Sequence, residues 1–133
     1  MLEAYARTVA DRMPVPDTGS AAQDLTEFMA ALYAVVHHPL RMESLRGMMA
    51  AAQLDPDFRV AFTAWTGTRR AVVADLLRRG IATGELDPGL DVDYAADLIF
   101  GPFWYRMLVD HAPLDPAQAA GHLTRLLAGL RAR

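Results

Sequence analysis

The four histidines are the side chains in this sequence with the widest chemistry, because imidazole can ligate a metal or transfer a proton near neutral pH. They are His37, His38, His111 and His122. The first two are adjacent and would diverge by about 100° on a helix. The other two lie near different helix boundaries, so no pair has the i, i+4 spacing that holds a metal from one helix face. We expect surface histidines and no metal site.

No nucleophile or acid–base pair is indicated either. The sequence contains no cysteine, which excludes thiolate catalysis and cysteine-bound zinc. It has no G-x-S-x-G, H-E-x-x-H or glycine-rich phosphate loop. The acidic residues gather at expected helix starts, among them Asp17, Asp55, Asp57 and Asp115. The sequence therefore predicts a protein that is not an enzyme and that needs no cofactor.

Arg69 is the charged residue in the most unusual position, because it falls in the middle of an apolar helix face. That face contains Phe58, Phe62, Trp65, Val72, Val73 and Leu76. Burial of an unpaired guanidinium would be very costly. Arg69 could point into an aromatic-lined cavity and meet an acidic or polar group of a ligand. Alternatively, Arg69 forms an internal ion pair, with Asp97 as a candidate, or its apolar stem lets the guanidinium reach water. This structural interpretation is favoured, because buried charges in helical bundles are more often paired within the protein than used to bind ligands.

Three methionines, Met42, Met48 and Met49, lie at helical spacing and would form one face of the segment 40–54. We expect them to face aromatic and aliphatic residues of the neighbouring helices. Those are Phe28, Leu32, Phe62 and Trp65. Methionine side chains adapt to varied apolar ligands, but the same residues would equally fill a dry core. Periodicity leaves both interpretations open.

Proline, glycine and capping residues divide the chain into helical segments. Ser20 opens the second segment and Pro39 ends it, while Asp55 caps the fourth with Pro56 at its first position. The expected helices span about 2–13, 20–38, 40–54, 55–80, 91–110 and 115–130. The predicted fold class is all-α, a bundle of about six helices in a single domain over 1–133, with 1–13 as the tail of a linker helix.

The segment 91–110 has almost no polar face. Between Tyr94 and Val109 its only charged residues are Asp97 and Arg106, so it should be buried on more than one side. Gly101-Pro102 in its middle would bend the axis. The bend is either a packing device or a means of turning one side to a pocket and the other to a partner helix. The predicted pocket side is Phe103, Trp104 and Met107, and the predicted partner side is Tyr94, Leu98 and Tyr105.

The last segment carries apolar residues at the spacing of a helix-packing seam. They are Ala119, Leu123, Leu126 and Leu130. Since an exposed apolar face of this size is avoided by monomers, we expect the last two long helices of two copies to form a four-helix dimer interface.

Composition and charge limit the remaining functions. The chain has 133 residues, 53% of them hydrophobic, and a formal net charge of -3. This acidic balance gives no reason to expect DNA binding by the chain itself. No apolar run approaches the roughly 20 residues of a membrane span, and the start does not have the pattern of a signal peptide. We expect a cytoplasmic protein.

Five stretches together resemble the C-terminal domain of TetR-family transcriptional regulators. They are 14–20, 54–58, Arg69-Arg70, 79–86 and 95–106. The resemblance implies a homodimer that senses a small, largely apolar effector. It also implies that operator DNA is bound through an N-terminal helix-turn-helix, which has no counterpart in this sequence. A helical protein–protein interaction module without a ligand is the alternative.

The residues so assigned form two sets. The expected ligand contacts are Phe28, Leu32, Met42, Leu45, Met49, Phe62, Trp65, Arg69, Phe103, Trp104 and Met107. The expected dimer interface is Tyr94, Leu98, Tyr105, Leu123, Leu126 and Leu130.

Overall fold

The computed structural model describes residues 15–130, and within this range the chain forms five α-helices. They are α2 (Ala21–Val36), α3 (Pro39–Leu54), α4 (Pro56–Ala82), α5 (Val92–Val109) and α6 (Pro116–Leu130). The all-α prediction is confirmed for this part of the chain. The helix expected at 2–13 lies outside the described residues.

Side-chain caps start the helices where the sequence predicted them. The Ser20 hydroxyl accepts a hydrogen bond from the amide of Gln23, and the Asp91 carboxylate accepts one from the amide of Tyr94. Asp55 caps α4 by accepting from two amides of its first turn. Each cap satisfies backbone donors that have no partner within the helix. At α6 the Asp115 carboxylate accepts from the amide of Ala117.

Two helix boundaries differ from the expectation. Pro39 does not end α2, which stops at Val36, but is the first residue of α3, where a missing N–H costs nothing. α4 continues through Gly80 to Ala82, because the positive-φ glycine that marks the turn is Gly84, at φ +81°.

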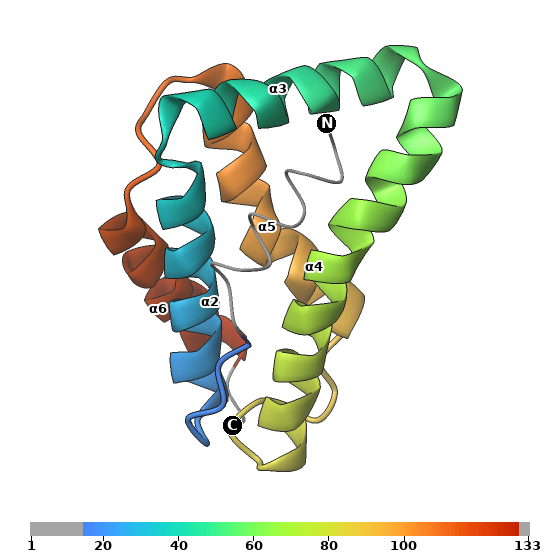
Figure 1. Ribbon diagram of the computed structural model, residues 1–133. Coiled ribbons are helices and arrows are strands. Elements are labelled where there is room, and N and C mark those ends of the chain that lie inside the picture. The colour runs from blue at the N-terminus through green and yellow to red at the C-terminus, as the bar shows by residue number, and fades with distance from the viewer. Residues whose placement is uncertain (1–14, 131–133) are drawn as a thin grey trace.

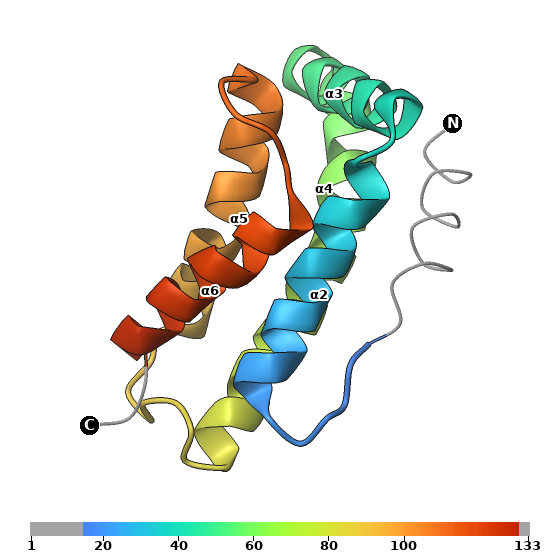
Figure 2. The ribbon, with the colours of Figure 1, turned by 90° about the vertical axis from the view of Figure 1, so that its left-hand side faces the viewer.

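The helices form an angular arrangement with α3 across one end (Figure 1). α3 joins α2 to α4, and α5 rises beside α4 towards α3. After a turn of 90°, α6 is seen crossing α2 and α5 (Figure 2), and its main packing partner is α2. α2 therefore lies between α4 and α6, which makes it the central helix of the core.

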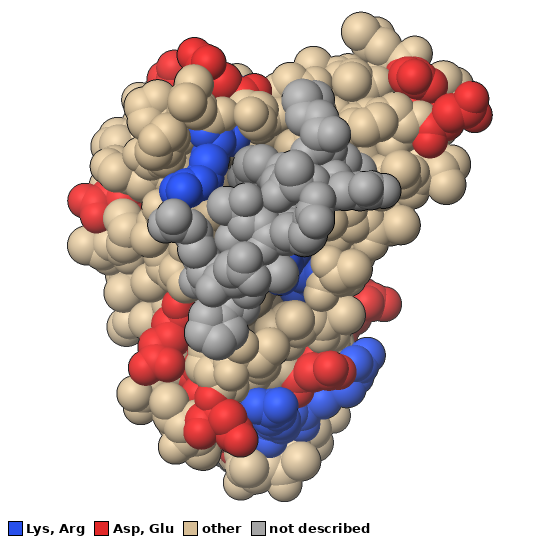
Figure 3. All heavy atoms as spheres, in the orientation of Figure 1, with Lys and Arg blue, Asp and Glu red and all other residues tan. Residues whose placement is uncertain are grey.

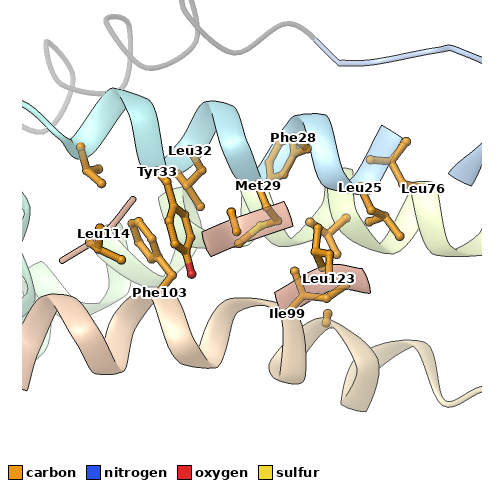
Figure 4. Packing of buried hydrophobic residues seen from close by; sticks show 14 of the residues in the cluster. Leu25, Phe28, Met29, Leu32, Tyr33, Leu76, Ile99, Phe103, Leu114 and Leu123 are labelled. Atoms are coloured by element: carbon orange, nitrogen blue, oxygen red, sulfur yellow. The ribbon is translucent and has the colours of Figure 1, made fainter. Parts of the chain in front are cut away.

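Apolar side chains from α2, α4, α5 and α6 meet in one core (Figure 4). From α2 they include Leu25, Phe28, Met29, Leu32 and Tyr33. Ile99 and Phe103 of α5 approach them from the opposite side. Burial of this many large side chains stabilises the fold at roughly 1.5–3 kcal/mol for each fully buried one.

The apolar face of α6, which was expected to meet a partner subunit, packs in large part against the chain's own core. Its buried residues are Ala119, Leu123 and Leu127, with Leu123 at 0% exposure. Because α6 crosses α2 closely, this face is covered by the chain's own core. Leu123 is therefore a core residue and is not available to a partner, whereas Leu126 and Leu130 are only partly buried.

Within the described range, none of the helices is both long and apolar enough to cross a membrane.

Candidate ligand-binding cavity

A cavity of about 440 Å³ lies between α4 and α5, with one contribution each from α2 and α3. Its volume falls within the roughly 300–1,000 Å³ of small-molecule sites. Its wall is mostly apolar. The lining residues are Leu32, Leu45, Thr63, Trp65, Thr66, Gly67, Arg69, Arg70, Asp97, Phe100, Gly101, Phe103 and Trp104.

Two contacts fix the register of the antiparallel helices α4 and α5 around this cavity. The rings of Phe62 and Trp104 lie with their centroids 6.2 Å apart, edge to face. Two turns further along α4, Arg70 Nη1 lies 2.6 Å from Asp97 Oδ1. The cavity is therefore bounded by an aromatic contact at the end near α3 and by an ion pair at the other end.

The aromatic end is a continuous group of rings. The centroids of Phe62 and Trp65 are 5.7 Å apart, and those of Phe103 and Trp104 are 5.5 Å apart. Tyr33 of α2 extends the group at 5.6 Å from Phe103. Tilted and edge-to-face pairs of this kind add to the stability given by burial alone. Of these rings, Trp65, Phe103 and Trp104 line the cavity, and Phe62 and Tyr33 pack beside them.

The charged end is organised by Arg70. Its guanidinium also donates to the backbone carbonyl of Asp93 at 2.7 Å and lies 3.8 Å from the Asp93 carboxylate. The internal ion pair that the sequence suggested for Arg69 and Asp97 is thus formed by the neighbouring Arg70. The reason is geometric: one residue further along α4 turns the side chain by about 100°, towards α5. Arg69 lies in the cavity wall itself.

The structure brings together six of the eleven expected ligand contacts in the wall of this cavity. They are Leu32, Leu45, Trp65, Arg69, Phe103 and Trp104. Met49 and Phe62 line a neighbouring hollow of about 380 Å³ that shares Trp104 with the cavity. Phe28 and Met107 are fully buried in the core, and Met42 packs against it.

Sequence reasoning missed the small and polar part of the wall. It comprises Thr63, Thr66, Gly67, Arg70, Asp97 and Gly101, and the aromatic residue Phe100 is a further wall residue that the sequence did not predict. The residues from α4 share one helix face at i, i+3, i+4 and i+7 spacing. That spacing is a usable signal for a polar wall, whereas the sequence prediction rested mainly on large apolar side chains.

The titration of Tyr33 is perturbed by its surroundings. Burial raises the pKa of its phenol above the usual 10.0, and the positive charge of Arg106 partly opposes the rise. A phenol with a raised pKa stays protonated at neutral pH and cannot act as a base there. In the described residues no group of three or more histidines or acids could hold a metal ion.

The chain matches a family described as the tetracyclin repressor-like C-terminal domain, over residues 15–126. The chain belongs to the TetR family. A similar curated protein is the uncharacterized HTH-type transcriptional regulator YdeS of Bacillus subtilis (strain 168), at 33% identity over 82% of this chain. The chain spans 55% of the length of that relative.

A solved structure agrees with this assignment. The TetR family transcription regulator SCO0332 superimposes with a TM-score of 0.86 at 30% sequence identity. The alignment covers 97% of this chain and 71% of the other. As a TetR-family regulator domain the protein is not an enzyme, as the sequence predicted.

The outer face of α5 is the second notable feature of this TetR-family domain. The buried residues of α5 all lie on one side, including Ile99, Phe103 and Met107. On the opposite side Tyr94 is 62% and Tyr105 is 61% exposed. The outer α5 face, defined here as Tyr94, Leu98, Gly101, Tyr105 and Leu108, follows the alternating spacing of four and three residues of a helix-packing seam. Within the described chain α5 is therefore buried on one side only.

Charged side chains are scattered over the face seen in Figure 3. Acidic and basic residues lie beside each other at the end of the molecule near the α4–α5 loop, and acidic ones mark the α3–α4 corner. A phosphate backbone is usually held by a clustered basic surface. This face of the TetR-family domain has no such cluster among its described residues.

Proposed function

We propose that this TetR-family domain senses a small, largely apolar molecule bound in the cavity between α4 and α5. The observation that carries the proposal is the cavity itself, which has ligand size and a mostly apolar wall with several aromatic rings and a few polar groups. An interaction module without a ligand needs no such cavity, and its core would be packed.

We propose further that the domain forms a two-fold homodimer through the outer α5 face and the exposed edge of α6. An apolar face with two tyrosines more than half exposed is the kind of surface that a partner covers. A second copy offers the same face, and a two-fold interface is self-complementary. Leu126 and Leu130 of α6 remain candidates for this interface, whereas Leu123 does not.

α5 would connect the two activities. Its inner side supplies Phe103 and Trp104 to the cavity, and its outer side supplies Tyr105 to the proposed interface. A ligand that moves the inner side therefore also moves the interface. In the longer regulator, this movement would change how DNA-binding segments outside the present chain are spaced, as expected of a cytoplasmic repressor or activator.

Tryptophan fluorescence tests the ligand site directly. The chain has two tryptophans, Trp65 and Trp104, and both line the cavity. A panel of small apolar compounds is screened for a rise in unfolding temperature, since a ligand that binds only the native state stabilises it by mass action. We expect compounds that raise this temperature to change tryptophan emission as well.

Single-tryptophan variants then locate the response. Trp65→Phe and Trp104→Phe should each reduce the emission change while leaving the unfolding transition cooperative. The proposal fails if stabilising compounds leave the emission of both tryptophans unchanged, because the ligand would then bind elsewhere.

A further inference from the structure

The middle of α5 contains a break in the backbone hydrogen bonds of the helix. In an α-helix the carbonyl of each residue accepts a hydrogen bond from the amide four residues later. For Leu98 that residue is Pro102, which lies inside α5 and has no amide hydrogen. The Leu98 carbonyl therefore lacks its ordinary helical donor. We call the segment from Leu98 to Pro102 the broken turn of α5.

α6 supplies a donor to this carbonyl. Nε2 of His122 lies 3.2 Å from the Leu98 carbonyl oxygen, in a partly buried position. A carbonyl oxygen can only accept a hydrogen bond, so this contact requires the imidazole proton on Nε2. A carbonyl shielded from water without a partner is costly. The imidazole of His122 therefore takes the place of the amide that Pro102 lacks.

A second side-chain contact joins α6 to α5 on the other side of the break. Nη1 of Arg106 donates a hydrogen bond to Oε1 of Gln118 at 3.1 Å. Leu98 precedes Pro102 by four residues, and Arg106 follows it by four. α6, which crosses α5 in Figure 2, therefore bridges the broken turn with one link before the proline and one after it.

The broken turn is also part of the cavity wall. Phe100 and Gly101 lie within it, and both line the cavity between α4 and α5. The other α5 residues of the wall come directly before or after the broken turn, and they are Asp97, Phe103 and Trp104. Helices bend at a proline because one of their hydrogen bonds is missing there. A contact that fixes the broken turn therefore also fixes this side of the cavity.

We infer that His122 is a positioning residue for the proposed ligand site, because its hydrogen bond to Leu98 holds the α5 wall of the cavity in place. The functional part of this inference rests on the proposed ligand site, whereas the hydrogen bond itself follows from the contact between α5 and α6. A ligand that bends the broken turn would displace His122 and thereby move α6. That helix supplies Leu126 and Leu130 to the proposed dimer interface.

A double-mutant cycle tests the role of the hydrogen bond. His122→Leu removes the donor, and Pro102→Ala restores a backbone amide for the Leu98 carbonyl. With Pro102 present, we expect His122→Leu to lower the unfolding temperature by about 3–6 °C, because a partly buried carbonyl loses its partner. In the Pro102→Ala background the same substitution should have little effect, since the new amide then serves Leu98.

The matched control is His37→Leu, which removes another imidazole that contacts a backbone carbonyl, that of Leu114 at 3.3 Å. It should lower the unfolding temperature by the same amount in both backgrounds. His122→Gln should retain most of the stability, because its amide nitrogen can donate from nearly the position of Nε2. Equal losses for His122→Leu in the two backgrounds overturn the inference. If Pro102→Ala does not fold, equal losses for His122→Gln and His122→Leu overturn it.

Binding of 1-anilinonaphthalene, a neutral fluorescent dye, tests whether the same hydrogen bond positions the cavity wall. We expect His122→Leu to weaken binding by about threefold or more, because a wall that is less fixed must be ordered when the dye binds. Adding Pro102→Ala should restore the affinity, and His37→Leu should leave it unchanged.

The dye also separates this inference from the proposed function. If the dye binds the unmodified chain and His122→Leu equally well, the ligand site stands and the positioning role of His122 is wrong. If the dye does not bind the unmodified chain, the proposed ligand site fails, and the stability cycle alone then upholds or overturns the hydrogen bond of His122 as the donor to the broken turn.

Discussion

The carboxylate of Glu85, in the loop between α4 and α5, accepts a hydrogen bond from the backbone amide of Ala21 at 2.7 Å. It also accepts from the amide of Ala22 at 3.2 Å and from the hydroxyl of Ser20 at 3.0 Å. These amides belong to the first turn of α2 and have no acceptor within the helix. The negative charge is also favourable at the positive end of the helix dipole. Glu85 therefore ties the loop before α5 to the start of the central helix.

We expect Glu85→Ala to lower the free energy of unfolding by about 1–2 kcal/mol, because two backbone donors lose a charged acceptor. Urea unfolding followed by circular dichroism measures the change. The control is Glu43→Ala on the exposed side of α3, which should alter stability by less than about 0.5 kcal/mol. Equal free energies of unfolding for the two variants would show that the Glu85 cap contributes little to stability.

Gly80 lies where three parts of the chain approach closely. A β-carbon at this position would stand 2.6 Å from Leu86 Cδ1 and 2.9 Å from the β-carbon of Ala21. Alanine in a helix normally gains up to about 1 kcal/mol over glycine, but overpacking in a core costs about 1–3 kcal/mol. Since Leu86 and Ala21 are both buried, we expect the second effect to win and Gly80→Ala to lower the unfolding temperature.

Gly47 provides the opposite case within the same protein. It is an exposed helical glycine of α3, and a β-carbon at this position would meet no atom of a neighbouring element within 4 Å. Gly47→Ala should therefore raise the unfolding temperature. If both alanine variants shift this temperature in the same direction, the close approach at Gly80 does not determine its stability effect.

These glycines illustrate how far the sequence could predict the fold. Local chemistry specifies helix starts well, and Ser20 and Asp55 both act as caps as expected. The sequence predicts the end of α4 at Gly80 and not at Ala82, because this stretch contains two candidate stop signals, Gly80 and Gly84. Gly80 is needed because a side chain there would collide with Leu86, whereas Gly84 is needed for its positive φ. Only the tertiary contact with Leu86 distinguishes these two roles.

The candidate site shows a similar limit. Periodicity identified the apolar faces that supply Leu32 and Trp104 to the wall. It could not tell which helix would cover each face, so Leu123 was assigned to a partner although α2 and the core of its own chain cover it. Nor could it predict that Arg70 would pair with Asp97, because that depends on the register between α4 and α5.

Tyr33 should make stability depend on pH in the alkaline range. Its pKa is raised by burial, so the folded protein holds the phenol proton more tightly than the unfolded chain does. The resulting contribution to stability is complete below the ordinary value of 10.0 and is lost as the pH rises through the higher folded pKa. One proton changes the free energy of unfolding by at most about 1.4 kcal/mol per pH unit.

We therefore expect Tyr33→Phe to flatten the fall in stability between about pH 9.5 and 11.5. Urea unfolding at a series of pH values measures the slope. Tyr105→Phe, which changes an exposed side chain of α5, is the matched control. An unchanged slope in Tyr33→Phe would contradict the prediction.

The remaining prediction concerns the outer α5 face, which is the largest apolar surface of α5 that its own chain leaves exposed. Tyr105 and Leu108 lie on this face one turn apart, and both are exposed. Two glutamates here would place four like charges close together across a two-fold interface and would have to be buried without partners. The same substitutions in a monomer would stay in water and cost little.

We expect the unmodified chain to be a dimer by light scattering at about tens of micromolar, where an obligate dimer should be fully formed. The double variant Tyr105→Glu with Leu108→Glu should be a folded monomer, with the helical circular dichroism spectrum retained. The matched control is Leu54→Glu with Val60→Glu, which changes two apolar residues at the α3–α4 corner that are 86% and 73% exposed. This control should remain dimeric, because the corner lies away from the outer α5 face (Figure 1). A monomeric unmodified chain excludes the dimer outright, and a dimer that survives the α5 substitutions but is lost in the control would move the interface to the α3–α4 corner.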